Sequence, residues 1–275
     1  RSWALARASD SSLKTSRPRE RACLGSKTIC VDSSTAGVPI LLRIVGAFRK
    51  GDNEARVDPV IIFSVAIVVM AITTHEAAHA WVADLLGDPT ARRLGRVTLN
   101  PIPHIDLFMT IILPALLILT SAGVIFGGAR PVPVQINFLR NPRRDWALVG
   151  AAGPVSNILQ ALLWAGLLSA LLHGGVWDEG SWGVKVLQIG IYANILLAVF
   201  NFMPIPPLDG SRVVMYFLSP KALRAYMGLE RFGIFIILGL FLLVEPFRNI
   251  LRGGIDWLLT LILDLVAMPR TGGFF

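Results

Sequence analysis

The chain has 275 residues, of which 54% are hydrophobic and only 16% are charged, and its mean hydropathy is +0.62. Soluble domains carry about 25% charged residues, so this composition excludes an ordinary soluble domain and predicts an integral membrane protein. The formal net charge of +8 then indicates basic loops beside anionic lipid, and no nucleic-acid partner is expected.

The N-terminal stretch differs from the rest of the chain. Residues 1–36 are rich in Ser, Arg and Lys and lack an apolar period, so they cannot bury a core. We expect a disordered basic extension over 1–36 and a membrane domain over 37–275. A basic, Ser-rich extension is typical of a targeting segment, but it is also compatible with upstream read-through or a cloning remnant.

Five apolar stretches follow that are long enough to cross a bilayer. They are 58–84, 106–126, 146–172, 184–203 and 232–245 continuing through 250–268. Glu245-Pro246 interrupts the last stretch, which is therefore one kinked span or two. The expected fold is an all-α membrane protein, a polytopic bundle of about 5–6 transmembrane helices. The alternation from Arg93 to Leu99 predicts a short β element at the membrane surface.

The most informative motif ends the first apolar stretch. His75 and His79 are one helical turn apart and therefore share a face, where two imidazoles can hold one Zn²⁺. Glu76 between them can serve as a general base toward water. Ionisable residues in an apolar span are costly, so a functional site is favoured over a satisfied core histidine.

A zinc hydrolase needs a third protein ligand, for which Asp209 is the candidate. Three prolines in the segment Pro204-Ile205-Pro206-Pro207 cannot continue a helix, and non-helical backbone at membrane depth must be buried or line a cavity. We therefore expect this segment to turn Asp209 inward. An exposed turn just outside the membrane is the alternative.

Three further polar residues are candidates for supporting roles at the predicted site. Asn157 follows Ala152-Gly153-Pro154 within an apolar span, where it can bind a substrate backbone or an oxyanion, or else join two helices. His104 can orient or shield the zinc site with Asp106 fixing its tautomer, or Asp106 can instead cap the following helix.

Together these residues resemble the site-2 protease family of intramembrane zinc metalloproteases, over about residues 58–241. The resemblance rests on the histidine helix, the distant Asn201-Phe-Met-Pro-Ile-Pro-Pro-Leu-Asp209-Gly, the Ala-Gly-Pro-x-x-Asn run, and the stretch from Gly87-Asp88-Pro89 to Asn100-Pro101. It implies zinc ligands His75, His79 and Asp209, a catalytic Glu76, and a substrate-binding Asn157. The absence of a long loop in the core matches the compact bacterial branch, which has no peptide-binding insert.

The expected function is an intramembrane zinc endopeptidase with one Zn²⁺ per chain. Its expected partners are the lipid bilayer and a transmembrane protein substrate, which it cuts in or near a membrane helix. The expected location is a bacterial cell membrane, with an organellar membrane as the alternative. Two other functions stay open: a membrane metallopeptidase for soluble or lipidated peptide ends, and a non-catalytic scaffold or transporter with a structural metal.

Overall fold

A computed structural model of the chain describes residues 59–112, 116, 119 and 128–268. The predicted extension over 1–36 and most of the predicted span 106–126 lie outside these residues. The described elements are helical, which confirms the predicted all-α class. In chain order they are α2 (Pro59–Leu85), α3 (Thr90–Arg93), η2 (Ile102–His104), η3 (Leu107–Ile112), η4 (Ile136–Phe138), α5 (Pro142–His173), α6 (Trp182–Asn201), α7 (Asp209–Phe217), α8 (Pro220–Met227), η5 (Glu230–Phe232), α9 (Gly233–Leu243) and α10 (Glu245–Leu265).

Four helical segments of the described chain are long and apolar enough to cross a membrane. They are Pro59–Leu85, Pro142–His173, Trp182–Asn201 and Pro220–Leu243. Each overlaps one of the predicted apolar stretches, so these four predictions are confirmed and the chain is a membrane protein. The last segment contains α8, η5 and α9, and it begins earlier than the sequence pattern indicated.

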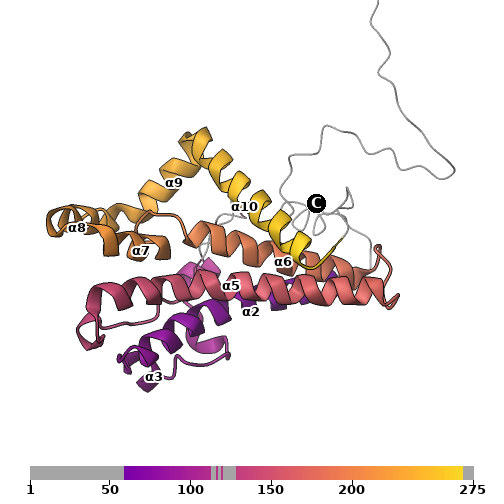
Figure 1. The fold of residues 1–275 in the computed structure, drawn as a ribbon, viewed down its shortest axis with the longest axis horizontal. Helices are drawn as coiled ribbons and strands as arrows, with labels where there is room; N and C mark the ends of the chain where they lie inside the picture. Colours follow the sequence, from indigo (N-terminus) through magenta and orange to yellow (C-terminus); the bar gives the residue numbers. More distant parts are fainter. Residues whose placement is uncertain (1–58, 113–115, 117–118, 120–127, 269–275) are drawn as a thin grey trace, which may run out of the picture. The chain divides into compact units, whose positions relative to one another are not determined.

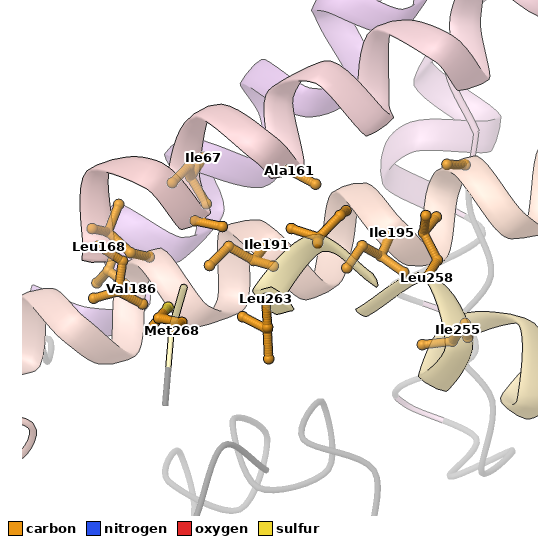
Figure 2. Close-up of a cluster of buried hydrophobic side chains, with 14 of the residues drawn as sticks. Ile67, Ala161, Leu168, Val186, Ile191, Ile195, Ile255, Leu258, Leu263 and Met268 are labelled. Carbon is orange, nitrogen blue, oxygen red and sulfur yellow. The ribbon is translucent and has the colours of Figure 1, made fainter. Parts of the chain in front are cut away.

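Three of these segments, α2, α5 and α6, pack against one another and form the centre of the bundle (Figure 1). Their shared core is apolar and includes Ile67 of α2, Leu168 of α5, and Ile191 and Ile195 of α6 (Figure 2). α5 turns small residues such as Ala161 toward this core, which lets its neighbours approach closely.

The predicted interruption at Glu245-Pro246 is confirmed. α9 ends at Leu243 and α10 begins at Glu245, with Pro246 in its first turn, where a missing N–H leaves no helical bond unmade. α10 packs one face, with Leu251, Ile255 and Leu258, into the core (Figure 2). It is not among the four segments apolar enough to span.

The predicted β element at Arg93–Leu99 is wrong. α3 ends at Arg93, and residues 94–100 form turns and bends. Gly95 adopts a left-handed φ of 68°, which breaks any extended run. The Arg96 guanidinium is buried and donates to the carbonyl of Pro103, so the segment folds back on itself. Alternation of polar and apolar residues forms a strand only where a second strand is available for pairing. Here the contact between Arg96 and Pro103 replaces such pairing.

The end of α2 is fastened to the segment that leads into α5. Asp88 is fully buried, and its Oδ2 accepts the backbone N–H of Gln135 at 2.6 Å while its Oδ1 accepts from Thr90. The backbone N–H of Arg140 also donates to the carbonyl of Leu86 at 3.1 Å. Gly87, with a φ of 114°, makes the turn that permits this contact. We call this set of bonds the Asp88 joint.

Candidate metal centre

The two histidines of α2 point into the bundle from successive turns, as their spacing predicts. Both are buried, at 6% and 3% exposed, and their Nε2 atoms lie 3.1 Å apart. The rings are nearly perpendicular, at 84°, so only the Nε2 corners converge. His75 and His79 therefore present two nitrogen donors to one point inside the bundle.

Asp209 reaches the same point from the start of α7. α6 ends at Asn201, the proline-rich turn follows, and Asp209 is the first residue of α7. Its Oδ2 lies 3.0 Å from Nε2 of His75 and 3.2 Å from Nε2 of His79. Asp209 is only 7% exposed, so the inward turn is observed and the exposed turn is not.

Two glycines make this approach sterically feasible. A Cβ atom on Gly210 would lie 2.6 Å from the carbonyl oxygen of Met203 and closer still to that of Phe202. A Cβ atom on Gly153 of α5 would lie 2.6 Å from Nε2 of His75 and closer still to Nε2 of His79. Gly153 thus leaves the space in which the two ring nitrogens meet.

The hydrogen bonds behind the rings set their tautomers. Nδ1 of His79 donates to the backbone carbonyl of Val149 at 2.6 Å, since a carbonyl can only accept. Nδ1 of His75 lies 2.6 Å from Oδ1 of Asn157, whose Nδ2 is turned to the carbonyl of Ala71. In the neutral rings both Nδ1 atoms then carry the proton, and both Nε2 atoms present lone pairs.

These three donors fit a tetrahedral metal ion. Two lone pairs and a carboxylate oxygen repel one another at separations of 3.0–3.2 Å unless a cation lies between them. Ligand atoms bound to zinc at about 2.0–2.1 Å in a tetrahedron lie about 3.3 Å apart, close to all three separations. His75, His79 and Asp209 therefore form a group that could bind a metal ion.

The charge state of Asp209 suits this task. Burial alone would raise the pKa of its carboxyl. The contacts with the imidazoles of His79 and His75 and the nearby Arg212 guanidinium outweigh burial and hold this pKa well below its usual range. Nη1 of Arg212 lies 3.4 Å from Oδ1 of Asp209, the oxygen that faces away from the histidines. Asp209 is therefore an anionic donor whose Oδ2 faces both histidines.

Glu76 differs from its two histidine neighbours because it is half-buried rather than buried. Its carboxylate is near enough to act electrostatically on His75 and on Arg96. Burial and Arg130 lower the pKa of Arg96, and Glu76 acts in the opposite direction. Glu76 is thus partly exposed and close enough to His75 and Arg96 to interact with both electrostatically.

Asn157 is fully buried in the bundle, between the helices rather than at their surface. Besides its contact with His75, its Nδ2 donates to Oδ1 of Asn194 on α6 at 2.9 Å. Asn194, also fully buried, donates from Nδ2 to the carbonyl of Gly190 at 2.8 Å. This arrangement favours orientation of His75 over contact with a substrate backbone. The sequence does not predict this role of Asn194, because a single amide in an apolar helix belongs to no recognisable motif.

His104 and Asp106 are not brought into the donor group. Nε2 of His104 donates to the carbonyl of Thr98 at 3.1 Å, and its buried Nδ1 has no hydrogen-bond partner among the described residues. Asp106 therefore does not fix the His104 tautomer. Its Oδ1 instead accepts the backbone N–H of Phe108 at 3.0 Å, as expected of a residue that caps the helix at Leu107–Ile112.

Comparison with known proteins finds relatives that are all named as putative zinc metalloproteases. The "Putative zinc metalloprotease YwhC" of Bacillus subtilis is 38% identical over 182 residues, which cover 65% of this chain and 80% of the relative. The "Putative zinc metalloprotease Rip2" of Mycolicibacterium smegmatis is 30% identical over 193 residues, or 69% of this chain and 70% of the relative. The "Putative zinc metalloprotease Rip2" of Mycobacterium tuberculosis is 30% identical over 217 residues, which cover 74% of this chain and 80% of the relative.

No protein-family model matches the chain, and no solved structure matches it. The two first-named relatives nevertheless align with 65% and 69% of the chain, and their name agrees with a buried donor group of two histidines and one aspartate. On this similarity the chain belongs to the zinc metalloprotease family of YwhC and Rip2.

Proposed function

We propose that the protein is an intramembrane zinc endopeptidase of the site-2 protease type, which cuts a peptide bond in or near a transmembrane helix of another protein. One observation carries this proposal. Three acceptor atoms of His75, His79 and Asp209 converge at 3.0–3.2 Å inside a bundle whose helices are long and apolar enough to span a membrane.

The residues present divide the chemistry between them. His75, His79 and Asp209 would hold one Zn²⁺, which when bound supplies a Lewis acid that lowers the pKa of water toward neutrality. Glu76 takes the proton of the attacking water and returns it to the leaving amine. The Arg96 guanidinium is close enough to Glu76 to interact with it electrostatically.

The surroundings of the site favour an apolar substrate. A cavity of about 430 Å³ lies between α5, α6, α10 and the turn after α6, and its walls are almost wholly apolar. It is lined by Ile158, which follows Asn157 in the chain, and by Met203 and Pro204 of the turn that leads to Asp209. A substrate helix must unwind locally before its amides are accessible, which Gly, Pro or Asn would ease.

Two features speak against a scaffold with a structural metal. Structural zinc sites usually have four protein ligands, whereas the donor group found among the described residues has three, which leaves a position for water. A structural site also has no use for a partly accessible carboxylate such as Glu76. The relatives named above are bacterial proteins, and we propose the bacterial cell membrane as the location of this protein.

A comparison of two substrates tests the proposal. The purified full chain in detergent is given a model transmembrane peptide with a central Asn-Pro pair, and separately a short soluble peptide with the same central residues. We expect cleavage of the membrane peptide that a zinc chelator stops and added Zn²⁺ restores. Cleavage of the soluble peptide alone would support a peptidase for soluble ends, and zinc binding without cleavage of either would support a structural site.

A further inference from the structure

The two oxygens of Asp209 have different neighbours. Oδ2 faces both histidine Nε2 atoms, at 3.0 and 3.2 Å, whereas Oδ1 faces Nη1 of Arg212 at 3.4 Å. Arg212 follows Asp209 by three residues on α7, so the two side chains lie on one face of that helix. A carboxylate can bind a metal through one oxygen or both, and a second oxygen would occupy the position that water needs.

Arg212 is itself held from its other side. Its Cζ lies 4.6 Å from the centre of the Trp146 ring of α5, a separation at which a guanidinium stacks on an aromatic face. The Arg212 side chain is only 22% exposed, so this contact is largely shielded from solvent. The guanidinium is therefore fixed between an aromatic ring and one carboxylate oxygen.

A glycine allows α5 and α7 to come close enough for this stacking. A Cβ atom on Gly150 of α5 would lie 2.8 Å from Cβ of Arg212 and 2.9 Å from the backbone oxygen of Asp209. Gly150 is one turn beyond Trp146, so the contact and the stacked ring lie on the same side of α5. Asp209, Arg212, Trp146 and Gly150 thus form one packed unit, which we call the Arg212 clamp.

We propose that Arg212 is a positioning residue: stacked on Trp146, it holds Oδ1 of Asp209 and so presents Oδ2 alone to the metal. This inference rests on the proposed zinc site. Lysine would not replace Arg212, because an ammonium is a point charge without a planar face to stack.

The test measures metal binding and coordination, not proteolysis. The full chain and its Arg212→Met variant are purified, zinc affinity is measured by competition with a chelator, and coordination is followed by the visible absorption of bound Co²⁺. We expect zinc affinity to fall by about 10–100-fold, the usual effect of losing a group that orients a ligand. We also expect the Co²⁺ spectrum of the variant to change to that of a higher coordination number, as Oδ1 becomes free to bind.

Arg143 offers a matched control. It also joins α5 to α7, because its Nη2 donates to the carbonyls of Met215 and Tyr216, each at 3.3 Å, and of Leu218. It has no contact with Asp209 among its described bonds. Arg143→Met should loosen the same pair of helices and leave both the affinity and the Co²⁺ spectrum unchanged. Equal changes in the Arg143 and Arg212 variants would mean that helix packing alone is responsible, and the inference would be wrong.

A second pair of variants acts through the ring instead of the guanidinium. Trp146→Phe keeps an aromatic face and should bind metal as the wild type does, whereas Trp146→Ala should reproduce the Arg212→Met spectrum. Wild-type behaviour of both Arg212→Met and Trp146→Ala would overturn the inference while leaving the zinc site intact. Failure of the unaltered chain to bind zinc would instead overturn the proposed function.

Discussion

Nδ1 of His75 lies 2.6 Å from Oδ1 of Asn157, so one donor of the metal site on α2 is oriented by a buried amide on α5. Asn157 in turn bonds to Asn194 on α6 at 2.9 Å. The orientation of a single imidazole thus depends on all three helices at the centre of the bundle. An unpaired amide in this interior would be costly, so each bond of the series stabilises the packing as well as the site.

This relationship predicts the effect of removing the amide. Asn157→Leu should lower zinc affinity by about 10–100-fold, because the ring loses the acceptor that fixes its tautomer. Gln160→Leu is the control, since Gln160 lies one turn away on α5 and its buried Nε2 has no hydrogen-bond partner in the part of the chain that the structure describes. Chelator competition on both purified variants measures the difference. Unchanged affinity in Asn157→Leu together with slower cleavage would return Asn157 to the role of a substrate or oxyanion contact.

Glu76 should move protons without holding the metal. Glu76→Gln should therefore keep wild-type zinc content and lose cleavage by about 10²–10⁴-fold, the usual contribution of a general base. Asp84→Asn on the same helix removes a carboxylate that pairs with Arg92 at 2.5 Å, and it should cut normally. Elemental analysis and a gel-based cleavage assay report the two quantities. Wild-type turnover by Glu76→Gln would rule out the proposed base.

Asp209 should be indispensable for metal binding. Asp209→Ala removes the only anionic donor of the group, so its loss of zinc affinity should exceed the 10–100-fold typical of residues that merely orient a ligand. Asp256→Asn, an exposed carboxylate of α10, is the control and should bind zinc normally. Full zinc occupancy in Asp209→Ala, measured at limiting free zinc, would contradict the assignment of Asp209 as a ligand.

Two glycines of α5 should respond in opposite ways to the same methyl group. Gly153→Ala places a Cβ atom 2.6 Å from Nε2 of His75 and should abolish zinc binding. Gly166→Ala meets no atom within 4 Å and should raise the free energy of unfolding by about 0.5–1 kcal/mol, since alanine favours a helix. Zinc content and Tm, measured on both variants, test this contrast. Normal zinc content in Gly153→Ala would mean that the rings do not converge as described.

Much of the fold and of the candidate site is predictable from local sequence. Apolar length predicts the spans, helical spacing places His75 and His79 on one face, and three prolines predict the turn that carries Asp209. Local pattern fails where a contact is made between distant segments. Trp146 and Arg212 stack although they are 66 positions apart, and Asn157 bonds to Asn194, which is 37 positions away. Sequence periodicity does not predict such pairs. The strand expected at Arg93–Leu99 failed for a different reason, because a contact within the loop, between Arg96 and Pro103, replaces strand pairing.

The Asp88 joint limits how the protein can admit a substrate. It ties the end of α2 to the segment before α5 through Oδ2 of one buried carboxylate and a backbone hydrogen bond, while Oδ1 of the same carboxylate holds the start of α3. The helix that carries both histidines and the helix that carries Asn157, Gly153 and Trp146 are therefore expected to move as one body. A gate for an incoming helix would then have to be formed by other segments, so that the entrance can open and close while the donor distances stay constant.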